Sequence, residues 1–215
     1  MAEEGRDSLH IYSPDTDVFI LALRRYPLLP PDTSMFLGAG MKRCVPLKPI
    51  YDALSPLKAA ALPALHALSG SDITGSFANK GKASWWKVFQ NASDEVLNDL
   101  ANLGATTTLS EGTIANLEKF VCQVYLPKTK IEDIGDARWW IFSKKHQFNE
   151  HLPPTKEALV PALRRAQFQA MVWHQDIQAV QTLPSPRTSV GPKPAKTWNL
   201  FHRRNPVLQN FSWKL

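Results

Sequence analysis

The chain has 215 residues, of which 44% are hydrophobic and 20% charged, a composition that suits a globular domain with its own core. No apolar stretch reaches the roughly 18 residues of a membrane span, and the acidic start MAEEGRDS lacks the pattern of a secretory signal. The net charge of +6 belongs to the C-terminal segment, because residues 177–215 hold six basic side chains and no acidic one. The sequence pI of about 9.4 is therefore weak support for nucleic-acid binding by the rest of the chain.

The N-terminal part of the chain predicts a small α/β unit. A strand is expected over 9–12 and, after a turn at Ser13-Pro14, a short helix over 18–23. Between 33 and 47 the pattern TSMFLGAGMKRCVPL predicts two short strands that form a hairpin. The hairpin turn is expected at Gly38-Ala39-Gly40, because glycine permits the positive φ that tight turns require.

From residue 49 onward the sequence predicts helices. Apolar residues recur at three- and four-residue spacing over 49–54, 56–69, 82–90, 93–103, 110–125, 131–144 and 155–176. Ser93 and Thr155 are expected to cap the N-termini of two of these helices. Beyond Asp176 the chain has five prolines and no acidic residue, which predicts a flexible basic tail over 180–215. The fold class expected is α/β, followed by a largely α-helical region.

Two carboxylates follow the first predicted strand. Asp15 and Asp17 lie two residues apart, and in an extended chain residues at this spacing point the same way. A pair of carboxylates at the carboxyl end of a strand suits Mg²⁺ or Mn²⁺, which bind through a few oxygen ligands and keep several waters. The alternative is that one of these aspartates caps the helix that follows.

A second informative stretch runs from Ala67 to Trp86. It predicts a helix, a turn of small residues and another helix. Asn79 and Gly81 tolerate left-handed backbone, so amides of the turn and of the next helix can face an anion. Three lysines add positive charge there: Lys80, Lys82 and Lys87. Such a turn grips phosphate without reading bases; the alternative is a plain helical hairpin with solvated lysines.

Taken in this order, the two stretches resemble the flap-endonuclease superfamily of 5′ nucleases, which have a PIN-like fold. In that superfamily a strand ends in S-x-D-x-D, and a later helix leads into a G-[CS]-D motif and a glycine-containing turn. The likeness is closer to a group of transposon-associated PIN-like proteins that carry SPDTDVFVL, a G-T-G-K-[KR]-R hairpin and HALTGCDTTSAFFGKGKKTAWK. This chain has SPDTDVFIL, GAGMKR and HALSGSDITGSFANKGKASWWK, and the resemblance extends over residues 11–186.

The resemblance implies a metal-dependent nuclease in which Asp15, Asp17 and Asp72 are catalytic metal ligands for Mg²⁺ or Mn²⁺. It also implies that Asn79, Lys80, Gly81, Lys82 and Lys87 belong to a helix-turn-helix element that contacts nucleic-acid backbone without sequence preference, DNA being favoured over RNA. The expected organisation is a partial PIN-like domain with this element over 1–92, a helical region over 93–179 and the tail over 180–215.

The chain departs from the superfamily at its front. Further carboxylates of the nuclease site come from strands upstream of S-x-D-x-D, and only twelve residues precede Ser13 here. The chain resembles a truncated copy, so impaired or absent cleavage is expected, together with self-association through uncovered sheet. The alternative function is a catalytically dead remnant that binds nucleic acid or a partner protein, and a third is an interaction scaffold with no nucleic-acid role.

Other candidate residues are expected to be structural. His66 lies within an apolar helical pattern, where a hydrogen-bonded core histidine is the expected role. Trp85-Trp86 and Trp139-Trp140 can stack on bases, but on amphipathic helices such pairs usually place one ring in the core and expose the other. The only cysteines are Cys44 and Cys122, too few for a disulfide framework, so an intracellular location in the nucleus or cytoplasm is expected.

Overall fold

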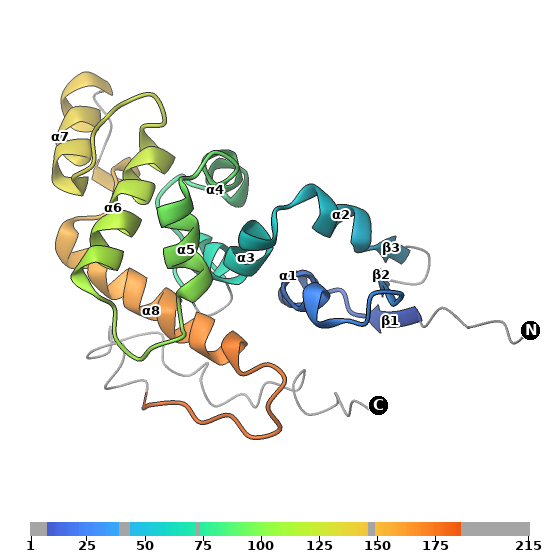
Figure 1. The fold of residues 1–215 in the computed structure, drawn as a ribbon. Helices are drawn as coiled ribbons and strands as arrows, with labels where there is room; N and C mark the ends of the chain where they lie inside the picture. The colour runs from blue at the N-terminus through green and yellow to red at the C-terminus, as the bar shows by residue number, and fades with distance from the viewer. Residues whose placement is uncertain (1–7, 39–43, 72–73, 146–148, 186–215) are drawn as a thin grey trace, which may run out of the picture.

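The computed structural model describes residues 8–38, 44–71, 74–145 and 149–185, and it combines one small sheet with a set of α-helices (Figure 1). The mixed α/β class expected from the sequence is confirmed at this coarse level. The sheet lies at one end of the molecule and the helices that follow it in the chain extend away from it (Figure 1). None of the described helices is long and apolar enough to cross a bilayer.

The sheet has three short strands in the order β1-β2-β3. Its strands are β1 (Ser8–Tyr12), β2 (Ser34–Gly38) and β3 (Cys44–Pro46). β1 and β2 are parallel and are connected through helix α1 (Thr16–Arg25) and a short 3₁₀ turn, whereas β2 and β3 are antiparallel. The predicted first strand and hairpin strands are therefore confirmed, and the hairpin turn over 39–43 lies outside the described residues.

The two faces of the sheet differ in burial because side chains alternate along each strand. One face carries the buried side chains Ile11, Met35 and Leu37. On the other face the His10 and Phe36 rings stack with centroids 4.9 Å apart, and Tyr12 is 77% exposed. A parallel pair of strands is usually buried on both faces, so this exposed face is consistent with the expected self-association, which stays a prediction.

The helices begin and end close to the predicted positions, with no end displaced by more than three residues. They are α2 (Lys48–Ala53), α3 (Pro56–Ser69), α4 (Lys82–Phe89), α5 (Asp94–Asn102), α6 (Glu111–Tyr125), α7 (Ile134–Lys145) and α8 (Lys156–His174), with a 3₁₀ turn at Asn149–His151. Ser93 caps α5 by accepting a hydrogen bond from the Val96 amide, as expected. Thr155 stands at the N-cap of α8, but its side chain does not cap an amide of the helix.

Helix α3 is the centre of the packing. It contacts α1, α4, α5 and α8, and its small side chains let these helices approach closely (Figure 1). Ser55 caps it by accepting a hydrogen bond from the Lys58 amide at 3.2 Å. One hydrophobic cluster extends from Ile11 in β1 to Trp173 in α8, so the sheet unit and the helical region share a core. The side of α3 that faces α1 and α4 carries the candidate site.

Candidate functional site

The segment after β1 is held by three successive hydrogen bonds that involve Ser13, Asp15 and Asp17. The Ser13 amide donates to the Gly38 carbonyl at 3.1 Å, which ties the end of β1 to the end of β2. The Ser13 hydroxyl then accepts from the Asp15 amide at 3.1 Å, and Asp15 Oδ1 accepts from the Asp17 amide at 3.0 Å. Asp15 is therefore the N-cap of α1, which confirms the alternative role considered for this pair.

The expectation that Asp15 and Asp17 share one face of an extended segment is wrong. Asp15 has extended backbone, with φ −82° and ψ 129°, but the helix starts at Thr16 and Asp17 belongs to its first turn. A carboxylate at this position is favourable because the helix N-terminus carries partial positive charge. Both side chains nevertheless line one pocket of about 410 Å³, so the fold brings them together by a different route.

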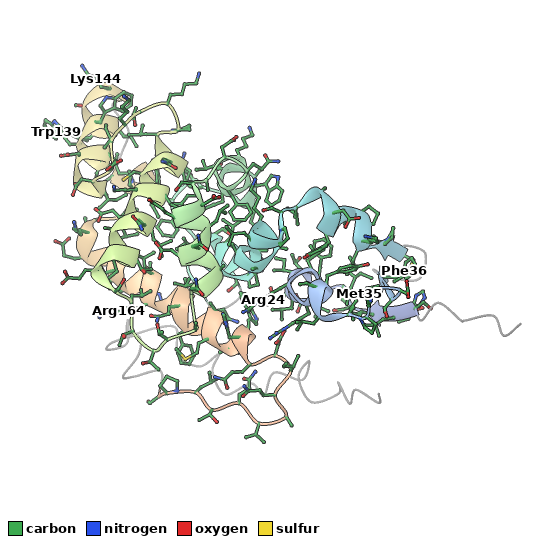
Figure 2. All side chains as sticks on the ribbon, viewed as in Figure 1. Arg24, Met35, Phe36, Trp139, Lys144 and Arg164 are labelled. Carbon is green, nitrogen blue, oxygen red and sulfur yellow. The ribbon has the colours of Figure 1, made fainter. Side chains whose placement is uncertain are left out.

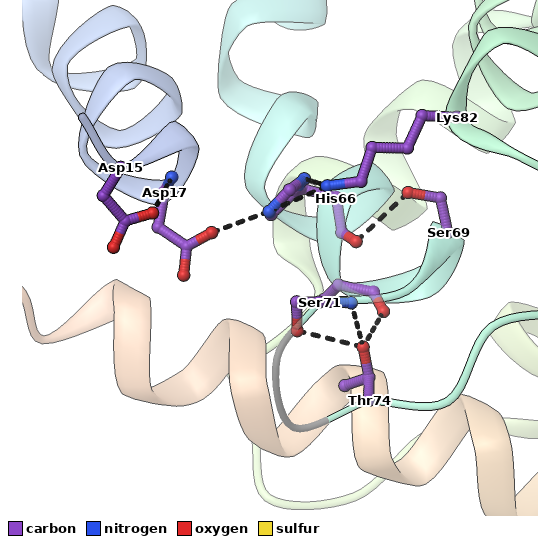
Figure 3. A network of polar contacts seen from close by, with 8 residues as sticks. Asp15, Asp17, His66, Ser69, Ser71, Thr74 and Lys82 are labelled. Atoms are coloured by element: carbon purple, nitrogen blue, oxygen red, sulfur yellow. Dashed lines mark hydrogen bonds and ion pairs between the residues drawn. The ribbon is translucent and has the colours of Figure 1, made fainter. Parts of the chain in front are cut away.

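Asp17 is engaged by a buried histidine. Asp17 Oδ1 lies 2.7 Å from His66 Nε2, and the ring, which comes from α3, is only 5% exposed (Figure 3). The Lys82 ammonium reaches the same ring from α4 and lies 2.7 Å from Nδ1, closer than the 3.3 Å to Nε2. A lysine ammonium only donates, so Nδ1 accepts and Nε2–H donates to Asp17. The hydrogen-bonded core role expected for His66 is confirmed.

The turn that follows α3, which carries the Gly70-Ser71-Asp72 motif, lines the same pocket. Gly70, with φ 106°, ends α3, and the Thr74 hydroxyl donates to the Ala67 carbonyl at 2.6 Å while accepting from the Ser71 amide at 2.8 Å (Figure 3). Gly70, Ser71 and Thr74 line the pocket that Asp15 and Asp17 also line. Asp72, the third predicted metal ligand, lies outside the described residues. The structure therefore brings both sequence motifs to one pocket.

The described residues of this pocket do not fit a resident nuclease metal centre. Within the described ranges, no three histidine, cysteine, aspartate or glutamate side chains form a group that can hold a metal ion. Oδ1 of Asp15 is taken by the helix cap and Oδ1 of Asp17 by His66. In addition, the Lys82 ammonium lines the same pocket and competes electrostatically with a cation.

The turn before α4 contains the predicted nucleic-acid contacts. Asn79 is in the left-handed region with φ 53°, as its residue type permits, and its side-chain amide contacts the His151 ring. Gly81 has extended backbone instead and is the N-cap of α4, with no side-chain cap and nothing within 4 Å of the position of a Cβ. The amides of the first turn of α4 are thus not covered by a capping side chain, which is the geometry in which helix N-termini bind anions.

The three lysines of this element lie in different surroundings. The Lys80 ammonium lies 4.9 Å from the centroid of the Tyr125 ring on α6, a cation–π contact. Lys82 reaches His66 on α3, whereas Lys87 is exposed near the C-terminal end of α4. Lys80 and Lys82 are thus held by different helices, and the structure shows no single cluster formed by these two ammonium groups.

Sequence reasoning missed the link between Asp17, His66 and Lys82. The three residues are separated by 49 and 16 positions in the chain and come from three helices. No local pattern signals such a contact; the amphipathic spacing of α3 predicts only that His66 is buried. No family model, curated protein or solved structure matches this chain, so the function is argued from the geometry of this pocket and its surroundings.

Proposed function

We propose that this chain is a PIN-like, nuclease-related domain that binds nucleic-acid backbone and has little or no phosphodiester cleavage activity. The observation that carries the proposal is the hydrogen bond between Asp17 and His66, backed by the Lys82 ammonium. The pocket keeps two acidic residues of the resembled motif, Asp15 and Asp17, but one oxygen of Asp17 accepts a hydrogen bond from His66, which Lys82 contacts in turn. One oxygen of Asp17 is therefore already occupied by a donor of the protein itself.

Cleavage of the kind implied by the resemblance uses two metal ions, which activate water and stabilise the leaving oxygen. Such a pair needs several carboxylates with free oxygens directed at the same point. The pocket supplies two described carboxylates, and each has one oxygen engaged within the protein. A complete two-metal centre is thus not supported by the described residues, and we derive no catalytic step through it.

Backbone binding is supported at the start of α4. Gly81 is exposed and provides no capping side chain for the first turn, and the exposed Lys87 follows on the same helix. Phosphate contacts from amides and lysines position a nucleic acid without reading its sequence. The tail adds six basic residues and no acidic one, which supplies a long-range attraction.

A protein-interaction scaffold is the second candidate, because Lys80 and Lys82 have partners within the fold. In that case neither lysine would be available for phosphate, and the element would have no nucleic-acid role. Substituting Lys87, which is exposed and lies outside both pockets, discriminates between these functions.

The experiment combines binding and cleavage on the full chain. Fluorescence anisotropy with single-stranded, duplex and flapped DNA should show binding without sequence preference, and Lys87→Glu should weaken it several-fold. Lys144→Glu is the matched control, since Lys144 is also exposed but lies on α7, far from α4 (Figure 2). Equal affinity of these two variants would favour the scaffold.

The same DNA substrates, incubated with Mg²⁺ or Mn²⁺, should remain intact. The double variant Asp15→Ala/Asp17→Ala controls for contaminating nuclease. Metal-dependent cleavage that disappears in this double variant would overturn the proposal and show that the pocket is a working active site.

A further inference from the structure

An apolar groove lies next to the acidic pocket, on the side of α3 that faces α1, α2 and α4. Its volume is about 730 Å³. The walls are aliphatic and aromatic and include Phe19 and Leu23 of α1, Ile50 of α2, Leu65 of α3, and Trp85 and Trp86 of α4. Small-molecule sites typically have volumes of about 300–1,000 Å³ and mainly apolar walls with a few polar groups. The groove has these dimensions and this lining.

The charged groups of the groove all have one sign. None of the described residues that line the groove is an aspartate or a glutamate, whereas two of them are lysines, Lys58 and Lys82. Lys82 is already paired through His66 with a carboxylate. The Lys58 ammonium instead donates to the Gln90 carbonyl at 2.8 Å, and it forms no ion pair within the part of the chain that the structure describes. Lys58 therefore offers an uncompensated positive charge at the edge of an apolar surface.

Trp85 adds a hydrogen-bond donor without an acceptor. The residue is fully buried, and its ring contacts Phe77 and Phe120 at centroid distances of 5.1 and 5.7 Å. Its indole Nε1–H has no acceptor among the described residues. Because this atom is out of reach of solvent, the indole N–H is a spectroscopic probe of the groove wall and not a contact for the ligand.

We propose that this groove binds a small amphiphilic anion, with an apolar chain packed between Phe19 and Trp86 and a carboxylate paired with Lys58. The positive rim selects a negative head group, and the apolar walls select a hydrocarbon body. The limited volume favours a single acyl chain over a longer polypeptide segment. This inference does not depend on the nucleic-acid function proposed above, because the groove and the DNA test involve different ligands.

The test uses dodecanoate below its micellar concentration, with dodecylamine and dodecanol as probes of the same length and different charge. Tryptophan fluorescence of the full chain should change saturably with dodecanoate, at one site per chain. Dodecanoate should bind at least ten-fold more tightly than dodecylamine. The indole N–H resonance of Trp85, followed by NMR, should shift on binding.

Variants separate the groove from general detergent-like binding. Lys58→Met should weaken dodecanoate binding about ten-fold, whereas Lys87→Met, a change at an exposed lysine outside the groove, should not. Ala53→Phe, which fills the groove from its α2 side, should weaken all three probes. Thermal melts identify any variant that fails to fold. Equal affinity for the three probes, or equal effects of Lys58→Met and Lys87→Met, would overturn the proposal. So would binding of an acidic amphipathic peptide without dodecanoate binding, which would make the groove a protein-docking surface.

Discussion

The polar residues of the Ser13–Asp17 segment resemble a metal-binding motif and also start helix α1. Ser13, Asp15 and Asp17 are the residues by which the motif resembles a metal site, yet each has a local structural partner. The side chains of Ser13 and Asp15 each accept a hydrogen bond from the backbone amide two residues ahead, a geometry typical of turns and helix caps. The motif is therefore required at least for the start of α1, whatever chemistry it also supports.

This capping role makes a stability prediction for Asp15. Asp15→Ala removes the acceptor for the Asp17 amide and should lower the free energy of unfolding by about 1 kcal/mol, the usual cost of losing an N-cap. Asp15→Asn keeps an oxygen in place and should cost a few tenths of that value. Urea unfolding of the two variants beside the wild type measures both effects. A similar loss in both would mean that the charge, rather than the cap, is what stabilises α1.

At the scale of elements, periodicity predicted nearly all of the helices because each one buries a face against α3 or its neighbours. The error at Asp17 arose because a two-residue spacing of acids fits both an extended chain and the start of a helix, where Asp15 caps and Asp17 interacts with the helix dipole. The pairing of Asp17 with His66 was not predictable, since it depends on how α1 and α3 pack. The groove was missed for the same reason.

Helices α1 and α8 are joined by a polar contact that the sequence did not signal. Arg24 lies 2.8 Å from His174 Nδ1, and Arg25 forms an ion pair with Asp176 and donates to the His174 carbonyl at 3.2 Å. Burial, reinforced by the two neighbouring arginines, lowers the pKa of His174 from 6.5 to about 4. The ring is therefore neutral near pH 7 and accepts the hydrogen bond from Arg24.

This contact predicts a pH dependence of stability. The unfolded chain binds a proton at His174 near pH 6.5, whereas the folded chain binds it only near pH 4, so the contribution is present above pH 6.5 and is lost as the pH falls toward 4. We expect a decrease on the order of 1 kcal/mol over this window, allowing for the half-exposed ring. Urea unfolding at pH 7 and pH 4.5 measures it. His174→Gln should flatten the dependence, and His10→Gln, at an exposed ring on β1, should leave it unchanged.

At the scale of the whole molecule, helix α3 contributes to the lining of both the acidic pocket and the apolar groove. The acidic pocket and the apolar groove lie on adjacent sides of it, and they share three lining residues, Thr16, His66 and Lys82. A ligand that draws Lys82 away from His66 would alter the environment of Asp17 as well.

The positive charge of the molecule lies in its C-terminal tail. Residues 1–176 are balanced, with 19 basic and 19 acidic side chains, and the tail carries the excess.

This division predicts that the tail dominates the salt dependence of nucleic-acid binding. Each phosphate neutralised contributes a slope of roughly −0.7 to −0.9 to log K against log salt, so a tail with six basic residues has the larger share. Replacing all six with glutamine keeps the length of the chain and should flatten the slope, while Lys87→Glu should lower the affinity and leave most of the slope in place. Anisotropy titrations on duplex DNA over a range of salt concentrations measure both. If the glutamine variant keeps the wild-type slope, the balanced body must present a basic surface of its own, and the phosphate contacts belong to the helices instead.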